Sequence, residues 1–371
     1  MRKGWEYKKL GEYVKEYSVK NKLNEEIPVY SVTNSQGFCK DYFGKEVASK
    51  DKSTYKIVPF GFFAYNPSRI NVGSIDWQAH EDRVIVSPLY NVFSVSAKLK
   101  QQYLLYYLKS PLTIHYIDSV ATGTVRLNLK FSMLKEFIVP VPSIAKQEYI
   151  VSELDKINEL IRLKKEQLKD FDNLAQSLFY EMFGEGKCLR KKLKDIVKIQ
   201  SGQVSPLEEP YSEMIHIGPA NIESNTGRLL NLKTAKEENL ISGKYLFDSS
   251  MVLYSKIRPN LNKVTIPSFE GICSADMYPI IPLESIDKNF LLFLLKQKEF
   301  LTYAISNSGR ANIPKINREA LLNYEAILPP LSHQCLFAQR IEQIEREKSE
   351  VQKSIQDLET LLASRMQYWF E

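Results

Sequence analysis

A repeat of about 185 residues constrains this chain more than any other feature of its sequence. Short segments return at an offset of 183 in the early part of each copy and of 187 further along. The matched pairs are 8–10 with 191–193, 103–109 with 290–296, 147 with 334, and 183 with 370. Self-similarity at a fixed period is the signature of one structural unit that is built twice. We therefore expect two copies of the same unit rather than one large domain.

In each copy the hydrophobic pattern changes at a short segment with two prolines, at 140–142 in the first copy and at 329–330 in the second. We call these segments the proline steps. Proline fits neither a helix interior nor a central strand, so each step predicts a boundary. After each step, apolar residues recur alternately three and four positions apart, which is the a/d pattern of a coiled-coil helix. These seam positions are Ile150, Leu154, Ile157, Ile161, Leu168, Phe171 and Leu178 in the first copy, and Phe337, Ile341, Ile344, Val351, Ile355, Leu358 and Leu362 in the second.

We expect the two predicted helices to pair with each other as a coiled coil. A helix of about 37 residues is roughly 55 Å long, which exceeds the width of one compact domain of this size. Lys164 and Lys348 interrupt the seams, and polar residues at such positions can set the register. The alternative is that each helix packs on its own globular half. That packing needs a wider apolar stripe, toward which Leu160, Leu163 and Leu174 would contribute.

Short runs rich in Val, Ile, Tyr and Phe, broken by Gly, Pro, Asn and Ser, fill the rest of each copy and predict strands. The expected strands are 27–33, 57–65, 83–95, 214–217, 251–256 and 277–282, and the expected short helices are 101–109 and 288–305. The predicted fold class is α+β: two mixed α/β domains, each with a central sheet, alternate with two long helices in a pseudo-twofold tandem repeat. The expected domains are 1–143 and 185–331, and the expected helical segments are 144–184 and 332–371.

The sequence lacks the patterns of several classes of protein. Its longest apolar runs are far shorter than the eighteen or so residues of a membrane span, and it opens without a signal-peptide pattern, so we expect a cytoplasmic protein. The four cysteines and four histidines are scattered without a C-x-x-C pair or a helical histidine pair, so we expect neither a disulfide framework nor a metal site. Because no phosphate-binding or dinucleotide-binding glycine loop is present, we expect no cofactor and no catalytic residues.

The predicted domains hold the whole excess of positive charge. The net charge of +6 divides into +7 over 1–143, +3 over 185–331 and −2 over each helical segment. A basic surface binds the nucleic-acid backbone with release of counterions, and Arg, Lys, Asn and Gln can read base edges. The candidate DNA-binding residues are loop cations and amides: Arg69, Asn71, Gln78, Arg83, Arg126, Asn128 and Lys130 in the first copy, and Lys256, Arg258, Asn260, Asn262, Lys263, Arg310, Asn312 and Lys315 in the second. Any single member is better explained as a solvated loop residue, but their repeated placement favours the groups.

With this order of elements, the chain resembles the specificity subunit of Type I restriction-modification systems over essentially its full length. The segments that carry the resemblance are 5–12, then 127–129 leading to 139–147, and 312–316 leading to 328–334. None of these segments is specific by itself, whereas their doubled arrangement is.

The resemblance implies that each globular domain is a target recognition domain that reads one half of a bipartite double-stranded DNA sequence. The two long helices would pair as an antiparallel coiled coil and act as a ruler across the unread bases. Two modification subunits would carry the methyl-donor site and form an adenine methyltransferase with this chain, and restriction motor-nuclease subunits can join for cleavage. The chain itself would be a non-catalytic subunit, which agrees with the missing catalytic motifs.

Two other functions stay open at this point. One is a coiled-coil adaptor that joins proteins and never contacts DNA, which the uneven charge distribution argues against. The other is a self-sufficient restriction-modification enzyme, which the absence of catalytic motifs argues against.

Overall fold

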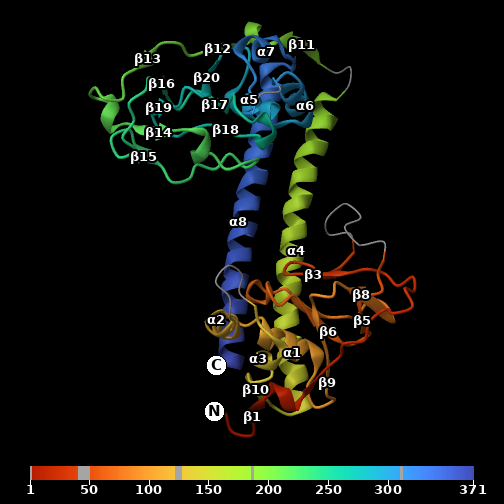
Figure 1. Cartoon of the computed structure of the whole chain (residues 1–371). Coiled ribbons are helices and arrows are strands. Elements are labelled where there is room, and N and C mark those ends of the chain that lie inside the picture. The colour runs from red at the N-terminus through yellow and green to blue at the C-terminus, as the bar shows by residue number, and fades with distance from the viewer. Residues whose placement is uncertain (1, 41–50, 122–127, 185–187, 310–311) are drawn as a thin grey trace. The chain divides into compact units, whose positions relative to one another are not determined.

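The computed structural model describes residues 2–40, 51–121, 128–184, 188–309 and 312–371 (Figure 1). Its contacts fall into two units, one made of Met1–Gln167 with Val351–Glu371 and the other of Leu168–Glu350. Each unit therefore takes its globular part from one copy of the repeat and its helical part from both copies. The borders of the units lie inside the two long helices rather than at the proline steps.

The globular part of the first unit contains small antiparallel sheets. Its four-stranded sheet has the order β2 (Val14–Glu16), β9 (Asn91–Val95), β6 (Phe63–Tyr65) and β7 (Ile75–Trp77). The two-stranded sheets are β1 (Glu6–Lys9) with β10 (Ile138–Val141), β3 (Ser31–Thr33) with β4 (Gly37–Cys39), and β5 (Lys56–Pro59) with β8 (Arg83–Val86). The short helices are α1 (Gln101–Leu108), α2 (Pro111–Val120) and α3 (Phe131–Leu134).

The second unit repeats the same framework. Its four-stranded sheet has the order β12 (Val197–Ile199), β20 (Met277–Pro282), β17 (Val252–Ser255) and β18 (Val264–Thr265), and β11 (Leu189–Lys192) pairs with β21 (Glu325–Leu328). A five-stranded sheet adds β13 (Gln203–Val204), β16 (Lys244–Phe247), β19 (Gly271–Cys273), β14 (Ile215–Ile217) and β15 (Lys233–Thr234), and the short helices are α5 (Lys288–Lys296), α6 (Lys298–Ser306) and α7 (Arg318–Asn323). The doubled order of elements confirms the predicted tandem repeat.

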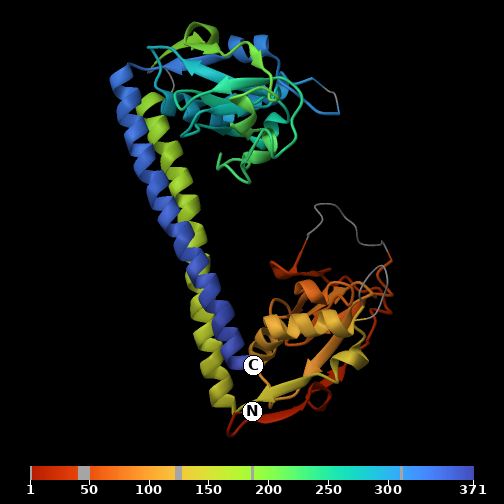
Figure 2. The ribbon, with the colours of Figure 1, turned by 90° about the vertical axis from the view of Figure 1, so that its left-hand side faces the viewer.

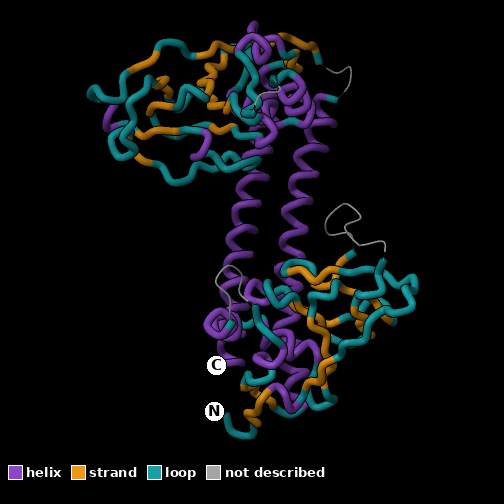
Figure 3. The backbone as a smooth tube through the Cα atoms, in the orientation of Figure 1, coloured by secondary structure: helices purple, strands orange, loops and turns teal. Residues whose placement is uncertain are grey.

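The expected central sheet of each domain is divided into several smaller sheets, and long loops connect the short strands (Figure 3). The predicted strand 57–65 is broken at Gly61, which has a positive φ of 79° and turns the chain between β5 and β6. The predicted helix 288–305 is broken at Gln297, which has an extended backbone between α5 and α6. Hydrophobic patterning does not reveal these breaks, because the apolar residues continue on both sides of each turn.

The two long helices, α4 (Ile144–Phe183) and α8 (Leu331–Phe370), pack against each other in antiparallel directions (Figures 1 and 2). In the first unit, the Lys165 ammonium lies 2.8 Å from a Glu359 carboxylate oxygen across the pair. In the second unit, the ring of Phe179 on α4 packs edge-on against Phe337 on α8. The predicted antiparallel coiled coil is confirmed.

The seam residues are buried along the stretch where no globular core covers them. Ile157 and Ile161 on α4, and Ile344, Val351 and Ile355 on α8, are all at most 8% exposed, although none belongs to a globular core. The remaining middle seam residues, Leu168, Phe171 and Leu358, are half-buried. The helix pair therefore forms its own apolar core.

The buried apolar stripe of α4 is too narrow to pack along its whole length on a globular domain. Leu160, Leu163 and Leu174 are 46–51% exposed, so they contribute little to the buried face. The alternative in which each helix packs only on its own half is therefore wrong over most of the length of α4. At its first turns, however, Ile150 and Leu154 do join the core of the first unit.

Ion pairs join the two helices at Lys348, which interrupts the seam, and at Arg365. The Lys348 ammonium lies 2.8 Å from Asp172 on the opposite helix and 3.0 Å from Glu345 on its own. Arg365 pairs with Glu153 across the helices, and its hydrogen bond holds the pKa of the Glu153 carboxyl below its usual range. Because such partly exposed pairs add little stability, their main effect is on the register of the two helices.

A buried glutamine side chain binds the first turn of each long helix to its own globular part. The Gln147 Oε1 accepts a hydrogen bond from the Lys100 backbone N–H at 2.8 Å. Its Nε2 donates to the carbonyls of Lys98 at 3.0 Å and Pro142 at 2.9 Å. The side chain is fully buried, and its bond to the Pro142 carbonyl is shielded from water.

The second copy repeats this network at an offset of 187. The Gln334 Oε1 accepts from the Asp287 N–H at 2.9 Å, and its Nε2 donates to the carbonyls of Ser285 at 3.0 Å and Pro329 at 2.8 Å. Gln334 is also fully buried. The repeated network explains the matched glutamines that the sequence shows after each proline step.

The far end of each long helix is buried in the core of the other copy. Phe183, at the end of α4, packs edge-on against Phe290 and Phe337 in the second unit. Phe370, at the end of α8, packs edge-on against Tyr103 and Tyr107 in the first unit. Each unit therefore needs helical residues from both copies to complete its core.

Replacing Gln334 by Leu should destabilise the second unit by about 1–3 kcal/mol, because the buried bond to the Pro329 carbonyl and two half-buried bonds to the backbone would be lost. Calorimetric melting of the full chain would measure the effect. Gln339→Leu is the matched control, since Gln339 is exposed on the same helix. Equal melting temperatures for the two variants would contradict the assigned role of the buried glutamine.

Replacing Ile355 by Asp should weaken the helix pair in the first unit by several kcal/mol, because an unpaired carboxylate would be buried at a position that is 2% exposed. Leu361→Asp should have little effect, since Leu361 lies on the same helix and is 46% exposed. Thermal unfolding followed by circular dichroism at 222 nm compares the two. A similar loss in both variants would argue against the assigned seam.

Candidate nucleic-acid interface

The structure brings together the two basic clusters that the sequence predicts in the second copy. The Arg258 backbone N–H donates to the Pro314 carbonyl at 2.7 Å, and the Ile316 N–H donates to the Lys256 carbonyl at 3.0 Å. Ile257 and Lys315 form an antiparallel bridge between these bonds. Residues about 60 positions apart in the sequence therefore share one surface.

The first copy has the same arrangement. The Leu129 N–H donates to the Pro67 carbonyl at 3.0 Å, which joins the loop around Arg69 to the segment that contains Asn128 and Lys130. Leu129 and Ile316 are equivalent at the repeat offset of 187, and both are fully buried. Each unit thus presents two loops that are joined by a backbone hydrogen bond at the same place.

Seven of the predicted residues are exposed and make no side-chain hydrogen bond or ion pair with any other residue that the structure describes. We call them the reading set: Arg69, Asn128, Lys130, Arg258, Asn260, Asn312 and Lys315. They combine four cations with three amides, and both units contribute both kinds. Such side chains are free to approach phosphates and base edges.

Two predicted residues are buried parts of the fold instead. Gln78 is fully buried, its Nε2 donates to the Glu81 carbonyl, and its Oε1 accepts from the His80 N–H at 2.6 Å. Asn262 is 7% exposed, and its Nδ2 donates to the Lys296 carbonyl at 3.3 Å. The amides of Gln78 and Asn262 are used inside the fold, so burial gives no support to the prediction of DNA contact at these two positions, which stays a prediction.

Three predicted cations are engaged with neighbouring groups. The Lys256 ammonium donates to the Ala275 carbonyl and lies 5.7 Å from the centre of the Tyr278 ring. Lys263 donates to the Pro219 carbonyl at 2.7 Å. Arg83 pairs with Glu25 at 2.6 Å. These cations can add to the local positive potential, but some of their N–H groups already bond to the protein.

The remaining predicted residues are Asn71, Arg126 and Arg310. Asn71 is half-buried and lines a hollow between its loop and the helices of the first unit. Arg126 and Arg310 lie outside the described residues.

The backbone at Arg258 is strained. Its φ of 47° places it in the left-handed region, which non-glycine residues seldom adopt. Its own N–H bonds to Pro314 and the Leu261 N–H bonds to its carbonyl at 2.9 Å, and together these hold the strained turn. Such conformations persist where the surroundings impose them, and they cluster at functional sites.

Sequence reasoning missed two tyrosines behind these loops. The Tyr65 hydroxyl donates to the Leu129 carbonyl at 3.0 Å, and the Tyr278 hydroxyl donates to the Ile316 carbonyl at 3.3 Å. Burial raises the pKa of both hydroxyls above the ordinary tyrosine value, so both keep their protons. In the sequence they look like ordinary strand tyrosines, and no motif marks them.

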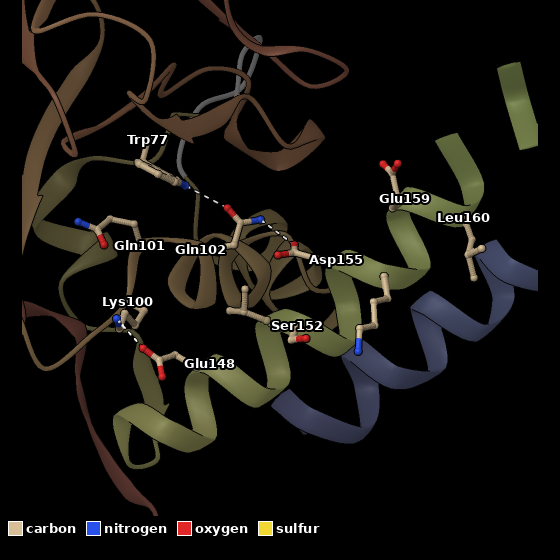
Figure 4. Close-up of a pocket in the computed structure, with 11 residues that line it drawn as sticks. Trp77, Lys100, Gln101, Gln102, Glu148, Ser152, Asp155, Glu159 and Leu160 are labelled. Carbon is tan, nitrogen blue, oxygen red and sulfur yellow. Dashed lines mark hydrogen bonds and ion pairs between the residues drawn. The ribbon is translucent and has the colours of Figure 1, made fainter. Parts of the chain in front are cut away.

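A groove of about 810 Å³ in the first unit runs between α4 and the start of α1 (Figure 4). Trp77 Nε1 donates to Gln102 at 3.1 Å, and Gln102 donates to Asp155 on α4 at 3.5 Å. Glu148 and Glu159 add two further carboxylates to the lining. Lys100 pairs with Glu148 at 2.7 Å, and Lys156 is the other cation of the lining. Because the three carboxylates outnumber the two ammonium groups and repel phosphate, we assign this groove to the joint between domain and helix rather than to nucleic acid.

None of the helices that the structure describes carries the long uncharged apolar stretch that a bilayer crossing requires. Among the described side chains, no three of the His, Cys, Asp and Glu residues gather closely enough to hold a metal ion.

Comparisons with known proteins agree with the doubled architecture. A family model described as the Type I restriction modification DNA specificity domain matches residues 2–170 and 189–360. The chain is 36% identical over 193 residues to the Type I restriction enzyme EcoDI specificity subunit of Escherichia coli, which covers 52% of this chain and 40% of that protein. It is 26% identical over 175 residues to the MjaIX specificity subunit of Methanocaldococcus jannaschii, which covers 42% of this chain and 40% of that protein. The chain thus spans less than half the length of these two relatives.

A third relative, the MjaVIII specificity subunit of Methanocaldococcus jannaschii, is 24% identical over 315 residues, or 72% of each protein. Solved structures share the fold. A chain from a study of the assembly and conformational transition of the type I R-M system has a TM-score of 0.63 at 16% identity, covering 99% of this chain and 97% of that chain. The Type I restriction-modification S subunit from M. genitalium has a TM-score of 0.54 at 14% identity, covering 99% and 96%. Since the family model matches each copy of the repeat, the chain belongs to the Type I restriction modification DNA specificity family.

Proposed function

We propose that this chain is the non-catalytic DNA specificity subunit of a Type I restriction-modification complex and reads a bipartite sequence in double-stranded DNA. The observation that carries the proposal is the reading set, which lies on two equivalent pairs of loops, one pair in each unit. Arginine and asparagine can pair with base edges in the major groove, while lysine neutralises phosphates. Two equivalent readers suit a target with two half-sites.

In this proposal, α4 and α8 are the spacer that connects the readers. A coiled coil keeps a fixed register through its packed seam, so it suits the role of a ruler across unread base pairs. The cross-helix pairs of Lys348 with Asp172 and of Arg365 with Glu153 support a single register.

The proposal assigns the chemistry to partner subunits. Two modification subunits would supply the methyl-donor site and methylate adenine, and motor-nuclease subunits would join where the system also cleaves DNA. This assignment is supported by family membership and by the absence of methyl-donor and phosphate-binding motifs from the sequence. The complex would act in the cytoplasm, where its DNA substrate is.

The test is to map methylated adenines after this chain is expressed with its modification subunit in a host without other adenine methylation. We expect methylation at one bipartite sequence and none when either chain is expressed alone. Methylation without a bipartite consensus would contradict DNA readout by this chain. DNA binding by the complex that is unaffected by salt would instead favour the coiled-coil adaptor, because phosphate contacts weaken steeply as salt rises.

Replacing Arg258 by Ala should relax discrimination at one base pair of a single half-site by about 1–3 kcal/mol, or roughly 5- to 150-fold, if its guanidinium pairs with a base. Methylation rates on targets with single-base changes would measure this effect. Arg346→Ala is the control, because it removes an exposed guanidinium from α8 and should leave every ratio unchanged. Equal loss at both half-sites would contradict the assignment of the second unit to one half-site.

A further inference from the structure

The second loop of each reading surface is held by one buried residue with exposed neighbours. In the first unit this residue is Leu129, which lies between Asn128 and Lys130. Its N–H bonds to the Pro67 carbonyl and its own carbonyl accepts from the Tyr65 hydroxyl. The positions of both exposed neighbours therefore depend on how firmly this one peptide segment is held.

In the second unit, Ile316 has the equivalent place beside Lys315. Its N–H bonds to the Lys256 carbonyl, and its own carbonyl accepts from the Tyr278 hydroxyl. The neighbouring backbone bond from the Arg258 N–H to the Pro314 carbonyl and the bridge between Ile257 and Lys315 hold the segment before Ile316. The bond from the Tyr278 hydroxyl holds the other side of the residue.

The two tyrosines are on strands that are not equivalent in the two copies of the repeat. Tyr65 is on β6 and is paired with Asn91 of β9. In the equivalent pair of the second unit, Tyr254 of β17 lies opposite Tyr278 of β20. The Tyr254 hydroxyl is buried and has no hydrogen-bond partner in the described structure, while the opposite Tyr278 supplies the bond.

A tyrosine hydroxyl therefore reaches the equivalent carbonyl in both units, although the strand that delivers it differs. If the tyrosines served only to fill the core, the hydroxyl would not need to reach this carbonyl from either strand. Both rings lie in the four-stranded sheets, so the hydroxyls are held by a rigid element behind a loop. A reading contact must be placed within about 0.5 Å, which a loop achieves only with such support.

We propose that Tyr65 and Tyr278 are positioning residues for DNA readout, each fixing the second loop of its unit so that its exposed side chains meet the correct bases. The inference rests on the proposed function and deepens it. Loss of either hydroxyl should reduce discrimination in one half-site, while contacts to the phosphate backbone persist.

The test compares three single-hydroxyl deletions in the full chain, assembled with its modification subunit: Tyr278→Phe, Tyr65→Phe and Tyr254→Phe. Methylation rates are measured on the correct target and on targets with single-base changes in each half-site. Arg258→Ala identifies the half-site that belongs to the second unit. Tyr254→Phe is the matched control, because it removes a buried hydroxyl that holds no carbonyl.

We expect Tyr278→Phe to reduce discrimination in the second unit's half-site by about two- to tenfold, the range for one lost hydrogen bond, and to leave the other half-site unchanged. Tyr65→Phe should do the reverse, and Tyr254→Phe should leave both unchanged. Uniformly slower methylation with unchanged ratios, or the same effect from Tyr254→Phe, would overturn the inference. If one variant fails to fold, the variant in the other unit still decides. A wild-type complex without any sequence preference would instead overturn the proposed function itself.

Discussion

The rest of the structure depends on the buried glutamine at the start of each long helix. Gln147 and Gln334 each satisfy three backbone groups, one of them in a fully buried bond, and leaving a buried group unpaired is costly. The direction in which each helix leaves its globular part is therefore determined. Because Phe183 and Phe370 then complete the core of the other copy, each unit is finished by residues from both repeats.

Hydrogen bonds to buried backbone groups also hold the loops of the candidate DNA surface. Leu129 and Ile316 are apolar, fully buried and bonded on both sides, whereas their neighbours are polar and exposed. In such a loop, the residue that stabilises the fold is distinct from the residues that can contact DNA. The buried residue provides the stability, and the exposed residues can change with little cost to folding, since surface substitutions away from such anchors usually have small effects. A surface of this kind suits a family of proteins that distinguishes DNA sequences.

Much of the fold could be predicted from periodicity. The repeat offset anticipated the matched sheets and the matched glutamines, and the a/d pattern anticipated the pairing of the two long helices, in which Ile355 is buried. The site was harder to predict. Gln78 and Asn262 have the same side-chain chemistry as the exposed amides, and only their burial distinguishes a turn residue from a candidate reading residue. Tyr65 and Tyr278 could not be predicted, because each acts on a carbonyl 38 or more positions away in the chain.

By itself, the sequence determined that one unit is written twice, that two long helices pair through their seams, and that the excess of positive charge lies in the globular parts. These properties are periodic or additive, so local physical chemistry is enough to detect them. Only the tertiary structure decided which loops meet, which polar side chains remain exposed, and which hydroxyl holds which carbonyl. Those outcomes depend on contacts between residues far apart in the chain, and the strand that supplies the hydroxyl differs even between the two copies of one repeat.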